Sequence, residues 1–212
     1  MNRHDFFNAL FPNPEEGYVD LRAFGAYTAQ SFVKIGDWAA LDAFVAQHPD
    51  LDHYFGVAVR VERDGVLAGK KPNCTVTHAA WADLDLKLYL PVALRAEMEH
   101  RETPLDRKQE IIASPEWQAG RFEAVLRIFG RPDRIPDLVI ESGGGFHVYW
   151  LSHEEAIACD ADLEALNRRI AAALGSDPKV ANWDRILRVP ETFNFKPEYQ
   201  RPQPVRFFDA TR

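Results

Sequence analysis

The sequence is poor in cysteine, in long apolar runs and in net positive charge. Its 212 residues include only two cysteines, Cys74 and Cys159, too few for a disulfide framework or a zinc site built from several cysteines. No stretch approaches the roughly 18 consecutive apolar residues that a membrane-spanning helix needs, and the N-terminus resembles no export signal. We therefore expect a cytoplasmic protein in a reducing compartment, without a membrane partner.

Acidic residues outnumber basic ones. The chain has 25 Lys and Arg against 32 Asp and Glu, a net charge of −7, which argues against a protein that coats nucleic acid through bulk charge. The balance is uneven, because residues 1–60 carry four basic and eight acidic side chains whereas residues 181–212 carry six and four. If a polyanion binds, we expect it to contact the C-terminal third.

The composition is that of an ordinary globular protein, with 46% hydrophobic and 27% charged residues. We find no internal repeat and no low-complexity segment. Helices are predicted after the N-capping residues Asp37 and Ser114. A third is predicted from a capping box at Ser152 and Glu155 to about Leu174. Strands are predicted over 53–61, 75–88, 137–141 and 145–151. This alternation of strands and helices favours an α/β or α+β sandwich.

Two aspartates lie two residues apart in the strand predicted over 75–88. Successive side chains of a strand alternate between its faces, so Asp83, Asp85 and Lys87 are expected on one face, above a leucine-lined core. Paired carboxylates repel one another unless a cation lies between them, and hard oxygen ligands favour Mg²⁺ or Mn²⁺. A solvated face of an antiparallel strand has the same alternation, so both interpretations stay open on this segment alone.

Three consecutive glycines separate the next two predicted strands, in Glu141-Ser-Gly-Gly-Gly-Phe-His-Val-Tyr-Trp150. Glycines allow a tight turn whose backbone N–H groups can approach phosphate oxygens. Alternation after the turn places His147 and Tyr149 on one face, and Phe146, Val148 and Trp150 on the other. His147 could hold a triphosphate or transfer a proton, or the segment could be a hairpin with a packed histidine.

The segment Asp177-Pro-Lys-Val-Ala-Asn-Trp-Asp-Arg-Ile-Leu-Arg-Val-Pro-Glu-Thr-Phe-Asn-Phe-Lys196 carries acidic, basic and aromatic residues. After Pro190 we expect Thr192, Asn194 and Lys196 to face outward over inward-packed Phe193 and Phe195. Arginine and lysine near carboxylates suit a substrate with clustered negative charge, such as a nucleoside triphosphate. A salt-bridged loop and edge strand would explain the same pattern.

Together and in this order, the three segments resemble the signature motifs of the archaeo-eukaryotic primase superfamily, the primase-polymerases, and most closely the replication primases of plasmids and phages. The motifs are Asp83-Leu84-Asp85, then Ser142 to Trp150, then Asp177 followed by Arg188-Val-Pro-Glu-Thr-Phe-Asn-Phe-Lys196. The resemblance spans about residues 54–196.

The resemblance implies an α+β fold, an RRM-like catalytic core of antiparallel or mixed sheet with helices, joined to an N-terminal α/β module. It implies one catalytic domain over 1–212 with two sub-modules, about 1–75 and 76–212, and without the C-terminal helical priming and helicase regions of many relatives. The implied activity is that of a DNA primase or polymerase, a template-directed nucleotidyltransferase that makes or extends primers on single-stranded DNA.

By the same resemblance, Asp83 and Asp85 would bind two Mg²⁺ or Mn²⁺ ions, with Asp177 as the third carboxylate and Asp184 in reserve. The metal ligands and His147 would be the catalytic residues. The implied nucleotide-binding residues are Ser142, Gly143, Gly144, Gly145, His147, Arg188, Asn194 and Lys196. The implied partners are a DNA template, NTP or dNTP, and a replicative helicase or initiator protein.

One motif position departs from the pattern. Glu191 stands where the family usually has glycine, so it either reshapes the turn or brings negative charge to the phosphate site. It is the best support for an alternative, a catalytically silent nucleotide- or DNA-binding module of a replication initiator. Trp183 and Phe193 are candidates for stacking on template bases, whereas Trp150 is expected to pack in the core.

Overall fold

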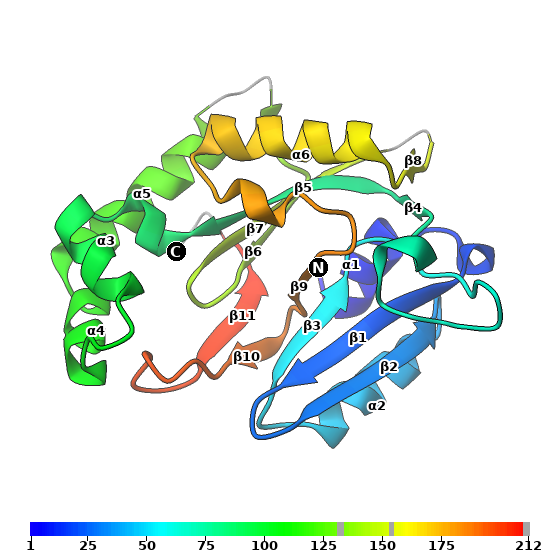
Figure 1. Ribbon diagram of the computed structural model, residues 1–212, viewed down its shortest axis with the longest axis horizontal. Helices are drawn as coiled ribbons and strands as arrows, with labels where there is room; N and C mark the ends of the chain where they lie inside the picture. Colours follow the sequence, from blue (N-terminus) through cyan, green and yellow to red (C-terminus); the bar gives the residue numbers. More distant parts are fainter. Residues whose placement is uncertain (131–133, 153–154, 210–212) are drawn as a thin grey trace.

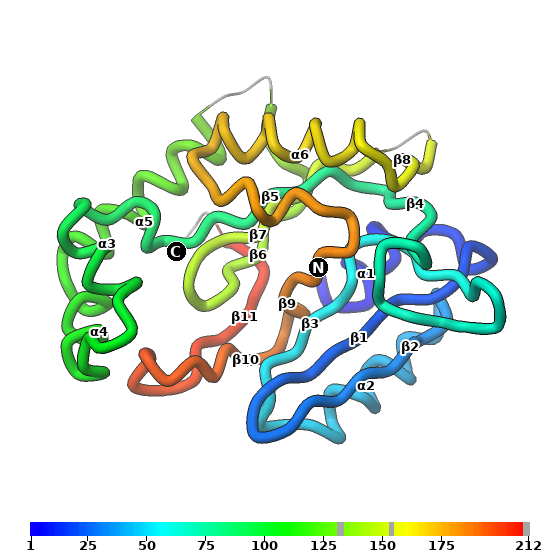
Figure 2. The backbone as a smooth tube through the Cα atoms, in the orientation of Figure 1, coloured from blue at the N-terminus to red at the C-terminus, as the bar shows by residue number. Residues whose placement is uncertain are grey.

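The computed structural model describes residues 1–130, 134–152 and 155–209. Its N-terminal sheet is antiparallel and contains strands β1 (Tyr18–Phe24), β2 (Thr28–Lys34), β3 (Asp52–Gly56) and β9 (Ile186–Arg188), in the order β2-β1-β3-β9. Helices α1 (Arg3–Leu10) and α2 (Trp38–Gln47) pack on one of its faces (Figure 1). Strand β9 comes from the C-terminal third and lies beside β3, as the tube in Figure 2 shows.

The second sheet is also antiparallel and has the order β10-β11-β6-β7-β5. Its strands are β5 (Ala79–Asp85), β6 (Leu138–Glu141), β7 (Gly145–Leu151), β10 (Thr192–Asn194) and β11 (Gln203–Phe207). Helices α5 (Pro115–Phe129) and α6 (Ala161–Leu174) cover one face (Figure 1). The smaller elements are α3 (Val92–Glu99), α4 (Leu105–Ile112), β4 (Val76–Thr77), β8 (Ile157–Ala158), and the 3-10 turns η1 (Pro14–Glu16), η2 (Lys71–Asn73), η3 (Leu86–Tyr89) and η5 (Pro178–Val180).

Alternation along the strands divides the core into two clusters. Phe146 and Val148 pack under the helices, whereas Trp81 and Tyr149 face the N-terminal sheet. Phe6 of α1 joins the two sheets, because its ring lies 5.5 Å from Tyr149 and 5.6 Å from Phe55 of β3, edge-on to both rings. The two sheets therefore share one core, and the α+β prediction is confirmed.

Local signals placed two helix starts correctly, whereas the helix expected from Ser152 begins at Ala161, because Asp160 is its cap and accepts hydrogen bonds from Asp162 N–H and Leu163 N–H. Asp37 caps α2 by accepting a hydrogen bond from Ala40 N–H, and Ser114 caps α5. Two predicted strands are too long: the one expected over 53–61 ends at Gly56, and the one expected over 75–88 ends at Asp85. The second ends there because the Asp85 carboxylate accepts a hydrogen bond from Lys87 N–H and starts turn η3, so Lys87 does not continue a strand face. Within the described residues, no helix is long and apolar enough to cross a membrane.

Candidate active site

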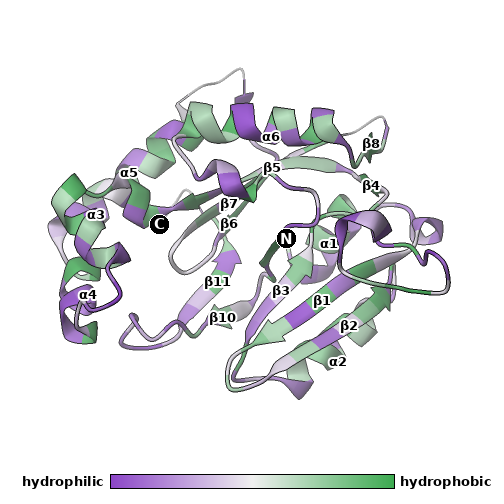
Figure 3. Cartoon of the chain, in the orientation of Figure 1, coloured by the Kyte–Doolittle hydropathy of each residue, from purple (hydrophilic) through white to green (hydrophobic). Residues whose placement is uncertain are grey.

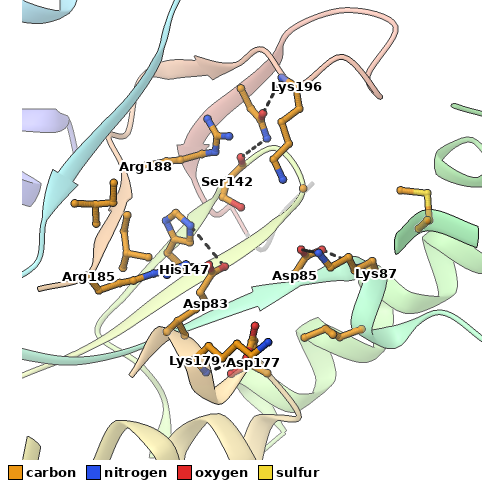
Figure 4. Close-up of a pocket in the computed structure, with 18 of the residues that line it drawn as sticks. Asp83, Asp85, Lys87, Ser142, His147, Asp177, Lys179, Arg185, Arg188 and Lys196 are labelled. Atoms are coloured by element: carbon orange, nitrogen blue, oxygen red, sulfur yellow. Dashed lines mark hydrogen bonds and ion pairs between the residues drawn. The ribbon is translucent and has the colours of Figure 1, made fainter. Parts of the chain in front are cut away.

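Strand pairing brings the first two motifs together. Strands β5 and β7 are antiparallel neighbours in which Asp83 lies directly opposite His147. The His147 Nε2 atom is 3.7 Å from Asp83 Oδ1, and Figure 4 shows the two side chains pointing toward one another. The predicted carboxylate and imidazole, 64 residues apart in the chain, therefore lie side by side on the sheet face opposite α5 and α6.

A cavity of about 870 Å³ opens over this pair, bounded by residues of both sheets. Most of the predicted site residues line it: Asp83, Asp85, Ser142, Gly144, His147, Asp177, Arg188, Asn194 and Lys196. Gly143 and Gly145 line a neighbouring hollow of about 370 Å³ on the other side of the glycine turn. Asp184 lines neither space.

The two carboxylates differ in their surroundings. Burial raises the pKa of Asp83 to about 6, and the Arg185 guanidinium, 3.8 Å from Asp83 Oδ2, opposes that rise. Asp85 is at the end of the strand, where its Oδ2 atom lies 3.0 Å from Lys87 Nζ. The two cations compensate the two negative charges, which explains how both carboxylates can occupy one cavity wall.

His147 is a neutral imidazole at physiological pH. Burial, together with the positive charges of Arg188 and Arg185, lowers its pKa from 6.5 to about 3. Its Nδ1 atom is buried and has no hydrogen-bond partner within the described part of the chain. A neutral imidazole can donate one hydrogen bond and accept another, so His147 can position a ligand oxygen without adding charge.

The glycine turn is required by close approach of the backbone. A Cβ atom at Gly145 would lie 1.8 Å from the carbonyl oxygen of Leu84 on the paired strand, and Gly143 has a φ of +81°. Ser142 N–H donates to the Gly145 carbonyl and closes the hairpin. Tyr199 packs on the turn, because a Cβ atom at Gly144 would lie 2.3 Å from its hydroxyl. The turn thus forms a rigid edge of the cavity.

Two residues of the third motif, Arg188 and Asn194, bind other residues of the protein. Arg188 is buried, makes a two-point ion pair with Asp52 at 2.7 and 3.2 Å, and lies over the Tyr54 ring. Asn194 donates from Nδ2 to the Ser142 carbonyl and accepts from Lys196 N–H. These contacts connect the third motif to β3 and to the glycine turn. Lys196 remains half-exposed in the cavity, with its Nζ 3.9 Å from a Glu198 carboxylate oxygen.

The two candidates for a third carboxylate differ in position. Asp177 lines the cavity and caps η5 by accepting a hydrogen bond from Lys179 N–H at 2.9 Å. Asp184 instead accepts a hydrogen bond from Asn182 Nδ2. Across residues 1–130, 134–152 and 155–209, no group of three or more His, Cys, Asp and Glu side chains is arranged to hold a metal ion.

Comparisons with known proteins concern the family and the fold. Residues 121–212 match the family described as the RepB DNA-primase N-terminal domain. The fold is similar to the AEP (archaeo-eukaryotic primase) domain of the cyanophage S-2L primase-polymerase, with 16% identity and a TM-score of 0.51 over 92% of this chain and 82% of that one. It is also similar to the catalytic domain of primase Repb′ solved in complex with initiator DNA, with 12% identity and a TM-score of 0.50 over 99% and 86%. No curated protein matches the sequence.

Residues 121–212, somewhat less than half of the chain, therefore match a replication-primase family, and the fold is similar to that of primase domains. The family match covers the second and third motifs, and the matched folds cover nearly the whole chain. The family match and the similar folds support the predicted replication-primase relationship and the predicted enzyme class, a nucleotidyltransferase of the primase-polymerase kind.

The main cavity has lining residues that the sequence did not single out as site residues. Arg185 contacts Asp83, Tyr54 lies under Arg188, and Lys179 and Tyr199 complete the wall. Arg185 lies in the third motif segment and its charge was visible there, but Tyr54 precedes the first motif. Nothing in the local pattern around Tyr54 shows that β3 and β9 pair, so sequence alone could not place it in the site.

The departure from the motif at Glu191 is explained by the turn before β10. Glu191 has a φ of +60°, the left-handed conformation that glycine adopts most easily. Its carboxylate accepts a hydrogen bond from Arg3 N–H at 3.1 Å, and it borders a separate hollow with Asp42. It does not line the main cavity, so it brings no negative charge to the wall that Lys196 shares.

The expected orientation of β10 is wrong. Thr192 and Asn194 are buried, whereas Phe193 is 49% exposed. The polar side chains face inward because Asn194 Nδ2 binds the Ser142 carbonyl and the Thr192 hydroxyl donates to Val189 O. Phe193 therefore lies on the opposite face from the cavity-lining Asn194. Trp150 packs against the helix-side core, as expected.

Proposed function

We propose that this chain catalyses template-directed nucleotidyl transfer, making or extending primers on single-stranded DNA. The observation that carries the proposal is the direct pairing of Asp83 with His147 across β5 and β7, in a cavity that also contains Asp85 and Lys196. Carboxylates, a neutral imidazole and cations in one cavity suit a triphosphate substrate and its counter-ions. DNA, the ligand named for the similar Repb′ catalytic domain, is the template we propose.

The chemistry of the donor set fits divalent cations. Asp83 and Asp85 offer hard carboxylate oxygens at the end of one strand, and Asp177 lines the same cavity. We propose these three residues as ligands of Mg²⁺ or Mn²⁺, with Asp177 preferred over Asp184 because Asp184 does not line the cavity. Two such ions, when bound, would activate the attacking 3′-hydroxyl and neutralise the leaving pyrophosphate.

The remaining cavity residues would bind and orient the triphosphate. Lys196 and Arg185 supply positive charge from the side of β9 and β10, and His147 and Ser142 offer neutral hydrogen-bonding groups between them (Figure 4). We assign the direct phosphate contacts to Arg185 and Lys196. We assign Arg188 a positioning role, because its guanidinium donates two hydrogen bonds to Asp52 and not to the cavity. The glycine turn keeps Ser142 and His147 at fixed places.

The test is extension of a labelled primer on a single-stranded template in Mg²⁺ or Mn²⁺. We expect Asp83→Asn to abolish extension while the unfolding transition in urea stays cooperative. Glu116→Gln, which removes an exposed carboxylate from α5, is the matched control and should extend normally. Normal extension by Asp83→Asn, or by the wild-type chain in excess chelator, contradicts the proposal.

A second measurement separates catalysis from binding. Nucleotide binding without product at any metal concentration would identify a silent binding module instead of an enzyme. Glu191 gives that alternative no support, because its carboxylate lies away from the main cavity. Once activity is established, primer extension with ribo- or deoxyribonucleotides measures which nucleotide is preferred. Adding a helicase or an initiator protein to the same reaction tests for a partner.

A further inference from the structure

Helices α1 and α2 lie on one face of the N-terminal sheet, and the other face leads into the cavity (Figure 1). On that second face Arg22 donates a hydrogen bond to the Gly69 carbonyl, in the loop before η2, at 2.8 Å. On β1, Val19, Leu21 and Ala23 point into the core beneath α1 and α2, so Arg22 and Phe24 point the other way. In Figure 1 this second face of β1, β2 and β3 is turned toward the viewer, and Figure 3 shows hydrophilic residues along it.

A row of side chains crosses the four strands on this face. Arg22 is paired with Gln30 of β2 on one side and with Tyr54 of β3 on the other, and Tyr54 is paired with Arg188 of β9. Tyr54 and Arg188 both line the main cavity. The row is therefore continuous with the proposed catalytic site, and a chain lying along it would enter that site.

The face offers flat aromatic groups whose surroundings are fixed. The Phe24 ring is partly exposed and lies 5.5 Å from the Tyr54 ring, nearly edge-on to it. Arg22 donates to the Asp20 carboxylate at 3.0 and 2.8 Å, and Gln30 donates to the same group at 2.7 Å. With its charges paired, this surface offers rings and hydrogen-bonding groups more than net charge, which agrees with the acidic N-terminal third.

We propose that this face, the sheet platform (Arg22, Phe24, Gln30 and Tyr54), carries the unpaired template strand into the cavity, with bases stacked on Phe24 and Tyr54. Stacking on aromatic rings accepts every base, as a template strand requires. Continuity with the cavity through Tyr54 and Arg188 favours a nucleic-acid strand over a protein partner. The inference rests on the proposed function, because a template must reach the transfer site.

The test is fluorescence anisotropy of a labelled single-stranded DNA oligonucleotide, without nucleotide or divalent metal. We expect Phe24→Ala to bind roughly tenfold more weakly, the loss of about one base stack, and Phe24→Trp to bind at least as tightly as the wild type. Phe122→Ala, which removes a more exposed ring from the helix side, is the control and should bind normally. Urea unfolding checks that each variant is folded.

The outcomes separate this inference from the proposed function. Wild-type affinity in Phe24→Ala, or no binding by the wild-type chain, overturns the sheet platform. If Asp83→Asn loses extension while Phe24→Ala binds DNA normally, the enzyme stands and the template lies elsewhere. If Phe24→Ala loses binding but the wild type makes no product, the platform stands and the catalytic proposal falls. If Phe24→Ala keeps the wild-type affinity for DNA but no longer binds a protein that the wild-type chain binds, the face belongs to a protein partner.

Discussion

The ion pair between Arg188 and Asp52 leads to the most quantitative prediction. Both side chains are largely buried, and their two contacts of 2.7 and 3.2 Å join residues 136 positions apart. The substitution Asp52→Asn keeps an oxygen for its hydrogen bond from Phe195 N–H but removes the charge that compensates the guanidinium. Leaving one partner of a buried pair uncompensated costs about 3–5 kcal/mol. Because Asp52 is partly accessible, we expect a loss of about 3 kcal/mol.

Urea unfolding followed by far-UV circular dichroism measures this loss. A change of about 3 kcal/mol in a protein of this size corresponds to a melting temperature roughly 6–12 °C lower. The double variant Asp52→Asn with Arg188→Met should lose less than Asp52→Asn alone, because no isolated charge is left in the interior. An unchanged free energy of unfolding in Asp52→Asn, or a double variant less stable than the single one, would refute this account of Arg188.

Three other predictions concern single positions. Glu191→Gly should be about 1 kcal/mol more stable than Glu191→Ala in urea unfolding, because both variants lose the hydrogen bond from Arg3 N–H to the side chain but only alanine keeps a Cβ atom at φ +60°. Equal free energies of unfolding would contradict backbone strain at this position. Burial lowers the pKa of His53 from 6.5 to about 4, so the folded state keeps the imidazole neutral while the unfolded chain binds a proton. The free energy of unfolding should therefore fall between pH 6.5 and 4, by up to about 1.4 kcal/mol per pH unit, and a His53→Gln variant with the wild-type slope would count against it. Gly145→Ala should destabilise the fold by more than about 3 kcal/mol, since its Cβ would meet the Leu84 carbonyl, and a well-folded variant in urea melts would overturn that reasoning.

Local sequence patterns predicted which side chains of β5 and β7 share a face. The alternation that placed Asp83 above the core and His147 on the face opposite Phe146 required only the period of a β-strand. The capping residues Asp37 and Ser114 fixed two helix starts for the same reason, because a cap depends on residues within one turn.

Contacts between distant segments could not be predicted in this way. Arg188 was expected to bind phosphate, but its partner Asp52 is in a strand that local patterns do not connect with β9. The inward side of β10 was assigned to its phenylalanines because hydrophobicity is the stronger local signal. The buried hydrogen bond from Asn194 to the Ser142 carbonyl outweighs that signal, and it exists only once the glycine turn is in place.

The placement of β9 affects how the chain folds during synthesis and where it can be truncated. Strand β3 can pair with β1 as soon as both have been synthesised, but its other edge stays unpaired until residues 186–188 have left the ribosome. The N-terminal sheet is therefore completed late, by strand β9, which is synthesised after β5, β6 and β7 of the second sheet. Fragments that stop before residue 186 would expose the β3 edge, and separating the halves would divide both the proposed sheet platform from β9 and the walls of the main cavity from one another.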